Sequence, residues 1–351
     1  MKQQDGDVKG SGPTMAQVAR EAGVSVPTVS KVLNGREDVA AETRRHVEEV
    51  LRRLGYQRQG YYNRPVPQQK TRTVDLIVHS LDTTWTGEVL AGAERAVQDA
   101  GMHLAVNAML GRTWHNRATR GWLDRIAARG TAGVVTNLAH VSDSELAWFE
   151  QNSIPYVMID PATAPPPQAY SVATTNWEGA RSGVQHLVDL GHRRIAVIAG
   201  RRSRYCSELR VEGYRSAMRA AHLRIPAAYV QYGDFDPYTS GERMKQLLDL
   251  PEPPTAVFVC SDVMAIYAMR VIRERGLEMP RDISIVGFDD LPESRWAVPE
   301  LTTVRQPLAE MGAEAIRTLV RIMDGEAPDN RRIELSTRLI ERASTAPPSE
   351  S

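Results

Sequence analysis

Residues 14–35, TMAQVAREAGVSVPTVSKVLNG, decide how the N-terminal part of this chain folds. Thr14 can cap a first helix with its side-chain oxygen, and Gly23 supplies the backbone freedom needed where that helix ends. Ser25 can cap a second helix, and Pro27 occupies its first turn, where a missing N–H costs little. The spacing predicts two short helices joined by a tight turn, the helix-turn-helix layout whose second helix enters the DNA major groove.

A third helix is expected from Ala41 to Leu54. The strings VAREAGVSVPTVSKVLNG at 18–35 and ETRRHVEEVLRRLGY at 42–56 closely resemble the headpiece of the lactose-repressor (LacI/GalR) family. The resemblance implies that the second helix reads operator DNA. The residues expected to contact DNA are Thr14, Ser25, Val26, Pro27, Thr28, Ser30, Lys31, Asn34, Tyr56 and Arg64.

Three of these residues take the base-reading positions of the family motif. Val26 and Pro27 offer only apolar contacts, for example to a thymine methyl group, whereas Lys31 can donate hydrogen bonds to guanine. The hydroxyl and amide side chains of the set are better suited to phosphates. Capping and solvent exposure alone would also account for Ser25 and Ser30.

Length and composition indicate a multidomain globular protein. The chain has 351 residues, of which 42% are hydrophobic and 25% charged, which predicts two or three domains. No run approaches the roughly 18 apolar residues of a membrane helix, and the polar residues 1–13 contain no signal-peptide core. We expect a cytoplasmic protein with a disordered N-terminal tail and no membrane partner. Cys206 and Cys260 show neither metal spacing nor a disulfide framework, so buried free thiols are expected.

Charge is unevenly distributed along the chain. The formal net charge is zero, yet residues 14–72 carry eleven Lys and Arg against six Asp and Glu. A basic head on a slightly acidic body suits DNA binding, because affinity follows the phosphates that are neutralised locally.

Residues 57–72 form a linker rich in Gln, Pro and basic residues. In most of the LacI/GalR family this segment contains a hinge helix that forms on operator DNA and wedges a leucine into the minor groove. Pro65 stands where the family usually has that leucine, and Pro67 interrupts a helix again. The sequence leaves open whether a hinge helix forms here. Arg64 can still reach the minor groove or a phosphate.

From Thr73 onward, apolar strands alternate with amphipathic helices, which predicts parallel sheets wrapped by helices. The expected strands are 73–80, 102–109, 131–138, 154–160, 193–200, 227–234, 255–262 and 282–290. The expected helices are 87–100, 117–129, 142–151, 179–190, 208–221, 240–250 and 263–275, with one more after residue 306.

This body resembles the periplasmic-binding-protein-like effector domain of the same family. The resemblance is strongest in GARSGVQHLVDLGHRRIAVIAG (179–200), LRVEGYRSAM (209–218), CSDVMAIYAMRVIRERGLEMPRDISIVGFDD (260–290) and PELTTVRQP (299–307). The predicted fold is an all-α helix-turn-helix headpiece plus an α/β periplasmic-binding-protein-like effector domain of two parallel-sheet subdomains.

The expected domain boundaries follow from these patterns. The headpiece should span 14–56 and the effector and dimerisation domain 73–345, before a disordered tail at 346–351. The first subdomain should comprise about 73–173 and 303–325, and the second about 174–302 and 326–345.

Polar and aromatic side chains follow the predicted strands, where ligands of open parallel sheets bind. Carboxylates, amides and rings meeting in one cleft suit a polyhydroxylated ligand. The strand-end residues also include Asn107 and Asn137. The expected ligand contacts are Asp82, Trp85, Asp160, Asn176, Arg210, Phe235, Tyr238, Asp262, Asp289 and Trp296.

Family roles carry over to three of them. Arg210 in LRVEGY resembles the arginine that grips effector hydroxyls, Asp289 in VGFDD an acidic contact, and Phe235 in GDF an aromatic stacking position. A salt bridge would also explain Arg210, and turn capping would also explain Asp289. Several aromatic residues favour an oligosaccharide or glycoside over a monosaccharide.

The functional expectation is a homodimeric, non-enzymatic repressor of carbohydrate-utilisation genes that binds double-stranded operator DNA and is released by a sugar. No phosphate-binding loop, dinucleotide fingerprint, HExxH or CxxC motif is present, so no catalytic residue, cofactor or metal is expected. A regulator with a purine or other non-sugar corepressor is the alternative. A transport protein would lack the DNA-binding head, and an enzyme would need turnover.

Overall fold

The computed structural model describes residues 13–33, 38–54, 56, 72–109, 121–138, 141–326 and 328–349. The expected DNA contacts of Asn34 and Arg64, and the prolines of the linker, Pro65 and Pro67, lie outside these residues.

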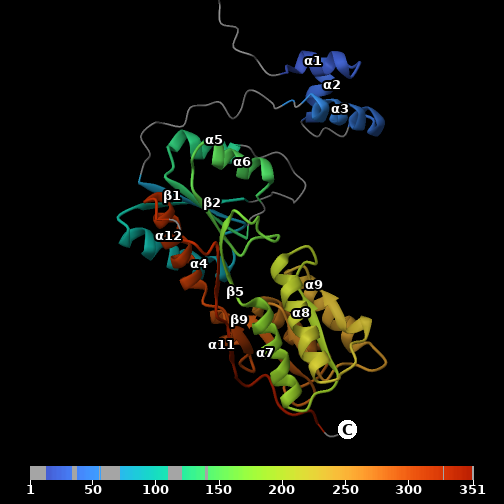
Figure 1. Cartoon of the computed structure of the whole chain (residues 1–351). Helices are drawn as coiled ribbons and strands as arrows, with labels where there is room; N and C mark the ends of the chain where they lie inside the picture. Colours follow the sequence, from blue (N-terminus) through green and yellow to red (C-terminus); the bar gives the residue numbers. More distant parts are fainter. Residues whose placement is uncertain are drawn as a thin grey trace, which may run out of the picture. The chain divides into compact units, whose positions relative to one another are not determined.

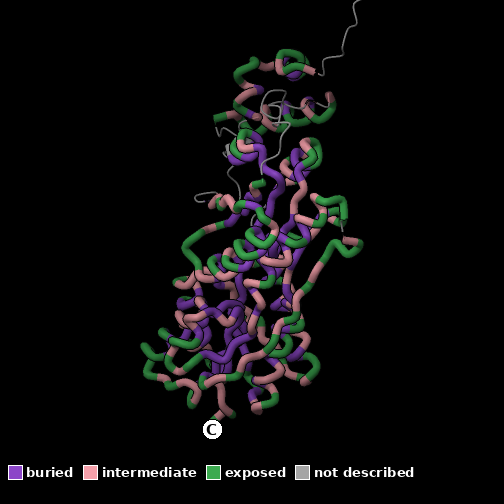
Figure 2. The backbone as a smooth tube through the Cα atoms, turned by 90° about the vertical axis from the view of Figure 1, so that its left-hand side faces the viewer, coloured by how far each residue is buried: buried purple, intermediate pink, exposed green. Residues whose placement is uncertain are grey.

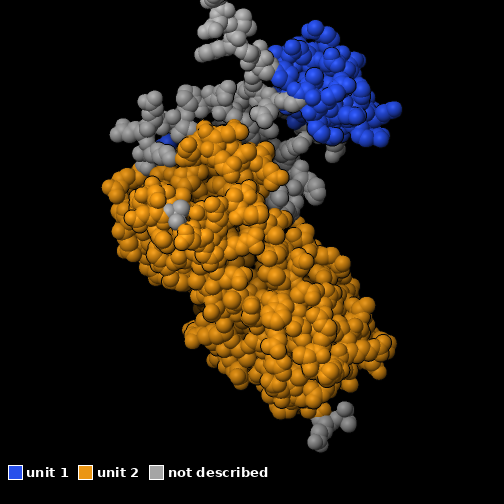
Figure 3. All heavy atoms as spheres, viewed as in Figure 1, with its two compact units in different colours: residues 1–70, 111–130 blue, residues 71–110, 131–351 orange. Residues whose placement is uncertain are grey.

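The chain divides into two compact units, residues 1–70 with 111–130 and residues 71–110 with 131–351 (Figure 3). The first unit contains three headpiece helices and α5 (Gly121–Arg129). The second contains two six-stranded sheets with their helices (Figure 1). Among the described residues, no helix has the length and apolar character needed to cross a membrane.

The predicted headpiece helices are present as α1 (Met15–Glu21), α2 (Val26–Leu33) and α3 (Ala41–Arg53). Thr14 caps α1: its Oγ1 accepts the Gln17 N–H at 3.3 Å, and the Gln17 side chain accepts the Thr14 N–H at 2.6 Å. Gly23 has φ +62° in the turn between α1 and α2, a conformation that glycine adopts at no steric cost. The three helices enclose a small core of Val18, Ala19, Ala22, Val29, Val32, Val47 and Val50.

The first sheet of the second unit is entirely parallel, in the order β11-β5-β4-β3-β1-β2. Its strands are β1 (Thr73–Val78), β2 (His103–Ala108), β3 (Gly133–Asn137), β4 (Tyr156–Ile159), β5 (Tyr170–Thr174) and β11 (Arg332–Leu335). The helices of this subdomain are α4 (Thr84–Asp99), α6 (Asp143–Gln151) and α12 (Leu308–Met323).

The second sheet has the order β12-β10-β9-β8-β6-β7 and is parallel except for the β10–β12 pair. Its strands are β6 (Ile195–Ala199), β7 (Val230–Tyr232), β8 (Ala256–Val259), β9 (Ser284–Asp289), β10 (Thr302–Arg305) and β12 (Arg338–Ile340). Its helices are α7 (Asn176–Asp189), α8 (Tyr205–Ala220), α9 (Pro237–Leu248), α10 (Asp262–Glu274) and α11 (Pro292–Trp296), with a 3₁₀ turn at Ala227–Tyr229.

Each sheet has its own hydrophobic core, and buried residues gather along the strands (Figure 2). In the first subdomain α4 and α12 pack closely. A Cβ atom on Gly92 of α4 would lie 1.7 Å from the carbonyl oxygen of Ala309 in α12, so only glycine permits this approach. The close contact fixes α4 and α12 as one wall beside the junction of the subdomains.

Within the described residues, the chain crosses between the subdomains three times, at residues 174–176, 305–308 and 335–338. This corrects the expected boundaries: residues 303–305 belong to β10 in the second sheet, and 332–335 belong to β11 in the first. The short strand β5 was also not expected. Edge strands such as β11, RIEL, alternate exposed and half-buried residues, so they lack the apolar run that marks the central strands.

The expected disordered tail at 346–351 is wrong for residues 346–349. Ala346 accepts hydrogen bonds through its carbonyl from the Ser284 hydroxyl at 3.1 Å, and its N–H donates to the same hydroxyl oxygen at 3.1 Å. The Ser349 hydroxyl donates to the carbonyl of Arg281. These contacts hold the C-terminal segment along the second sheet.

Candidate functional site

The early face of α2 presents the side chains expected to read bases. Val26, Pro27 and Lys31 are exposed, whereas Val29 and Val32 on the same helix are buried. Because the buried valines fix the rotation of α2, the remaining face is free to approach a duplex. The amphipathic pattern of this helix therefore positions the predicted reading residues.

Polar groups around α2 are partly engaged within the headpiece. The Ser25 hydroxyl accepts the Thr28 N–H at 3.3 Å and lies 2.8 Å from the Thr28 hydroxyl. Lys31 Nζ lies 2.6 Å from a carboxylate oxygen of Asp38. Both groups of this ion pair are largely exposed, so DNA phosphates or bases can replace Asp38 at small cost. Ser30 is half-buried, and Tyr56 packs against the headpiece core.

Arg210 lies at the centre of a buried polar network in the second subdomain. Its side chain is 3% exposed, and Nε donates to Asn176 Oδ1 at 2.7 Å. Nη1 donates to the Cys260 carbonyl at 2.7 Å and lies 3.7 Å from Asp289 Oδ1. The guanidinium also stacks 3.8 Å from the ring centre of Phe288. These contacts orient Arg210 firmly and bring it together with Asn176 and Asp289, as the sequence predicts.

Asp289 connects this network to the crossover strands. Gln306 Nε2 donates to Asp289 Oδ1 at 2.6 Å, and the Thr174 hydroxyl donates to Gln306 Oε1 at 2.6 Å. Asp289 has φ +122° and Asp290 φ +60°, both in regions that side-chain-bearing residues rarely adopt. Strained residues of this kind cluster at ligand-binding sites.

Two arginines hold the strained turn in place through Asp290. Arg305 Nε and Arg342 Nη2 each donate to an oxygen of this carboxylate at 2.5 Å. Burial favours the neutral acid, but the hydrogen bonds from Arg342 and Arg305 outweigh it and keep the pKa of Asp290 below its usual value. Asp290 is therefore a structural anchor beside Asp289.

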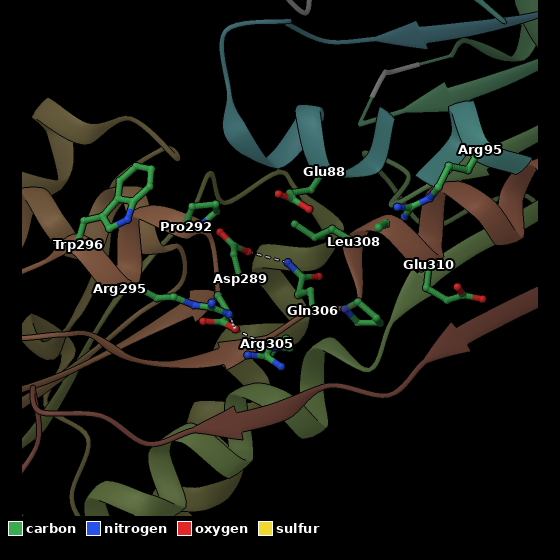
Figure 4. Close-up of a pocket in the computed structure, with 13 residues that line it drawn as sticks. Glu88, Arg95, Asp289, Pro292, Arg295, Trp296, Arg305, Gln306, Leu308 and Glu310 are labelled. Carbon is green, nitrogen blue, oxygen red and sulfur yellow. Dashed lines mark hydrogen bonds and ion pairs between the residues drawn. The ribbon is translucent and has the colours of Figure 1, made fainter. Parts of the chain in front are cut away.

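A pocket of about 670 Å³ opens beside Asp289, between the two subdomains (Figure 4). Its walls come from α4 and the start of α12 on one side, and from the end of β9 and α11 on the other. Asp289 and Gln306 meet at its wall, and the indole of Trp296 stands at one side. Carboxylate, amide and aromatic groups thus surround a space of the size that small ligands occupy.

Burial raises the pKa of Asp289 to about 7, although the positive charge of Arg210 opposes this shift. A carboxyl group with this pKa holds its proton more tightly in the folded chain than in the unfolded chain, where the value is about 4. The free energy of unfolding should therefore fall as the pH rises from about 4 to about 7. In the variant Asp289→Asn, which cannot titrate, urea unfolding should show a shallower fall. Equal slopes in both proteins would contradict the raised pKa.

Asp160 and Asp262 are buried carboxylates with different partners. Asp262 accepts hydrogen bonds from the Thr303 hydroxyl at 2.5 Å and from the Leu291 N–H at 2.8 Å. Both of its carboxylate oxygens are therefore engaged within the protein. Asp160 has φ +42°, and burial raises its pKa despite the nearby Arg210. The thiol of Cys206 hydrogen-bonds to Asp160. Asp160 therefore lies near the Arg210 network, whereas Asp262 supports the loop that leads to α11.

The aromatic residues predicted as ligand contacts occupy three different environments. Phe235 has φ +57° and packs its ring against Gly200. Trp85 is 9% exposed and belongs to the core of the first subdomain, which fits a packing role. Trp296 and Tyr238 are 76% and 72% exposed, and only Trp296 lines the pocket described above. Residue type alone did not separate these environments.

Asp82 is exposed and accepts a hydrogen bond from the hydroxyl of Ser80. It therefore belongs to the rim after β1 rather than to the buried network.

Some buried polar side-chain atoms in the described chain have no hydrogen-bond partner. Among the described residues, the Asn137 amide nitrogen and oxygen, Ser207 Oγ and Glu293 Oε2 are buried without a hydrogen-bond partner. Asn137 is the last residue of β3, and ligands of parallel sheets bind beyond the ends of strands. The sequence analysis therefore names Asn137 as a strand-end residue, although it does not include Asn137 among the expected ligand contacts. Ser207, Glu293 and the crossover residue Gln306 were missed. Gln306 lies in the family-like string PELTTVRQP, whereas nothing in the sequence marks Ser207 or Glu293.

No group of three or more metal-ligating side chains comes together within the described part of the chain.

Comparison with known proteins identifies the family. Residues 14–59 match the family described as bacterial regulatory proteins, lacI family, and residues 184–345 match a periplasmic binding protein-like domain. The chain is 31% identical over 335 residues to the HTH-type transcriptional repressor PurR of Klebsiella pneumoniae subsp. pneumoniae and of Escherichia coli. The match covers 95% of this chain and 97% of each relative.

Solved structures agree with this assignment. A complex of the transcriptional regulator CelR with cellobiose is 33% identical, with a TM-score of 0.74, and the match covers 95% of this chain and 99% of CelR. The lac repressor dimer bound to operator and the anti-inducer ONPF is 28% identical, with a TM-score of 0.70, covering 96% and 100%. These relatives are transcriptional regulators rather than enzymes. The chain therefore belongs to the LacI family of DNA-binding transcriptional regulators.

Proposed function

We propose that this protein represses carbohydrate-utilisation genes and leaves its operator when a sugar or oligosaccharide binds between its two subdomains. The observation that carries the proposal is the chain of contacts from Arg210 through Asp289 to Gln306. It runs from the buried network to the crossover segment after β10, beside a pocket that both subdomains line. A ligand held there would act directly on the segments that set the angle between the subdomains.

The chemistry of the site favours a polyhydroxylated ligand. At the pocket wall Asp289 supplies a hydrogen-bond acceptor, the amide of Gln306 carries both a donor and an acceptor, and Arg295 supplies donors. Sugar hydroxyls pair with groups of both kinds, and aromatic rings such as that of Trp296 stack on the C–H faces of sugars. The likeness to CelR, solved with cellobiose, supports the same ligand class.

The alternative is a regulator that needs a purine or other non-sugar metabolite as corepressor. The chain is 31% identical to PurR repressors and 33% identical to CelR, so overall sequence identity does not favour a sugar over a purine. The sign of the response separates the two: a corepressor tightens operator binding, whereas an inducing sugar weakens it.

We further propose that the protein acts as a homodimer, as the lac repressor does in its operator complex. Tyr238 of α9, Trp296 of α11 and Val298 are each at least 70% exposed, although all three are large and apolar. Tyr238 packs edge-on against Tyr267 of α10, with ring centres 5.4 Å apart, and Arg273 of α10 donates to the Val298 carbonyl. Exposed apolar residues on adjacent elements are typical of protein interfaces.

Lys31→Ala is expected to relax base preference in each operator half-site. Lys31 is the one charged side chain among the three proposed base-reading residues, and a good bidentate contact discriminates against a wrong base by about 1–3 kcal/mol. Selection from a random half-site library, followed by titration of single-base variants, measures the preference. Arg53→Ala, which removes an exposed ion pair with Glu21 at the far end of α3, is the control. An unchanged preference in Lys31→Ala would refute the reading role.

Calorimetric titration of the purified protein with mono- and oligosaccharides, and separately with purines, tests the proposed function. We expect saturable binding of at least one carbohydrate, and release of a half-site palindrome when that sugar is added. Binding of purines alone, with tighter operator binding, would favour the alternative.

A further inference from the structure

Glu293 joins the two subdomains without using a crossover strand. It lies in α11 of the second subdomain, and its Oε1 accepts a hydrogen bond from the hydroxyl of Thr84. Thr84 is the first residue of α4 in the first subdomain, a helix of 16 residues. A carboxylate is stabilised at a helix N-terminus, where the backbone N–H groups and the helix dipole favour negative charge. The contact therefore holds α11 against the start of α4.

The second oxygen of the same carboxylate has no partner. Glu293 Oε2 is buried, and nothing in the described chain donates a hydrogen bond to it. Buried polar atoms in native proteins are almost always hydrogen-bonded, so an unpartnered carboxylate oxygen is a rare feature that requires a cause. A donor that comes from outside the chain would supply the missing hydrogen bond.

The position of Glu293 is beside the pocket between the subdomains. Thr84 and Glu88 are four residues apart on α4 and so lie on the same face of that helix. Glu88 lines the pocket, as do Pro292 and Arg295 on either side of Glu293 in α11 (Figure 4). A ligand in this pocket therefore contacts the neighbours of Glu293 in α11 and the face of α4 that carries Thr84.

We propose that Glu293 is a specificity-determining residue for the effector: one oxygen latches the subdomains through Thr84, and the other accepts a hydrogen bond from an effector hydroxyl. This inference rests on the proposed function. An ionised carboxylate can only accept hydrogen bonds, so it selects a donor and discriminates against an analogue in which that hydroxyl is missing. Glu293 thus couples recognition of the sugar to the arrangement of α4 and α11.

Two nearly isosteric variants separate the roles of the two oxygens. In Glu293→Gln the amide oxygen can still accept from Thr84, but the amide nitrogen replaces the second acceptor. Thr84→Val removes the latch and leaves both carboxylate oxygens. Calorimetry with cellobiose and its monodeoxy analogues, on full-length proteins with matching thermal unfolding curves, measures the consequences.

We expect Glu293→Gln to bind cellobiose roughly ten- to a hundred-fold more weakly, as for loss of a hydrogen bond to a charged group. The unaltered protein should bind one deoxy analogue more weakly than cellobiose by a similar factor. Glu293→Gln should bind that analogue and cellobiose with nearly equal affinity. Thr84→Val should retain the discrimination between cellobiose and that analogue. If Glu293→Gln binds cellobiose as the unaltered protein does, the inference is overturned while the proposed function stands. If the unaltered protein binds no carbohydrate at all, the proposed function itself fails.

Discussion

Replacing Arg210 by Ala is expected to abolish the response to effector and to destabilise the second subdomain by about 1–3 kcal/mol for each buried acceptor left without a donor. Asp289, buried 3.7 Å from Arg210 Nη1, would lose its cation, and the pKa of its carboxyl group would rise further. The Asn176 side chain and the Cys260 carbonyl would lose donors in the same step. The headpiece has its own core, so its contacts with DNA do not depend on Arg210.

Urea unfolding and calorimetric effector titration measure the two expected effects of Arg210→Ala separately. Arg215→Ala is a suitable control, because Arg215 lies on the same helix, α8, and makes a half-exposed ion pair with Glu212. At temperatures where Arg210→Ala remains folded, it should bind operator but not respond to sugar. A normal calorimetric response in this variant would dismiss Arg210 as an effector contact.

Tyr238→Glu is expected to dissociate the homodimer and to weaken operator binding by roughly a hundred-fold or more. A charge in place of Tyr238, one of the exposed apolar side chains of the proposed interface, would be desolvated on association without a partner. A monomer engages one half-site only, and loses the gain of about 10²–10⁴ that two linked heads provide. Because Tyr238 is 72% exposed, the fold of each subunit should be unaffected.

Sedimentation equilibrium and operator titration test this surface. Ser182→Glu introduces the same charge at an exposed position of α7, which packs beside α8, and should remain dimeric with full operator affinity. If Tyr238→Glu stays dimeric at micromolar concentration, the interface lies elsewhere on the subunit.

Apolar periodicity predicted the central strands because they bury nearly all of their residues. The strand β3, GVVTN, is buried throughout and was expected from sequence. The strands β11 and β12 bury no residue completely, and no apolar pattern distinguishes them from loop. β11 lies at the edge of the first sheet and β12 at the edge of the second, so the chain crosses between the subdomains after β11. Because neither strand was predicted, the expected boundary at residue 326 was placed too early in the chain.

Family-like strings identified site residues whose role is set by local sequence. Arg210 and Asp289 were found in this way, and the structure brings them together. Glu293 was not found, because its partner Thr84 is 209 positions away and the sequence gives no sign that they meet. Aromatic residues were the weakest predictions, since Trp85 in the core and Trp296 at the surface are indistinguishable by type.

If the angle between the subdomains determines how the two headpieces bind operator DNA, effector binding and DNA binding must be thermodynamically linked. By reciprocity, a sugar that lowers operator affinity must bind the operator complex more weakly by the same factor. A coupling of about 1–3 kcal/mol corresponds to a factor of roughly 5 to 150.

The most direct test is to titrate operator DNA at constant salt with and without saturating sugar, and to titrate sugar with and without saturating operator. We expect both pairs of dissociation constants to differ by one common factor, and Arg210→Ala to reduce that factor to one. A protein that binds both partners with no mutual effect would contradict the account.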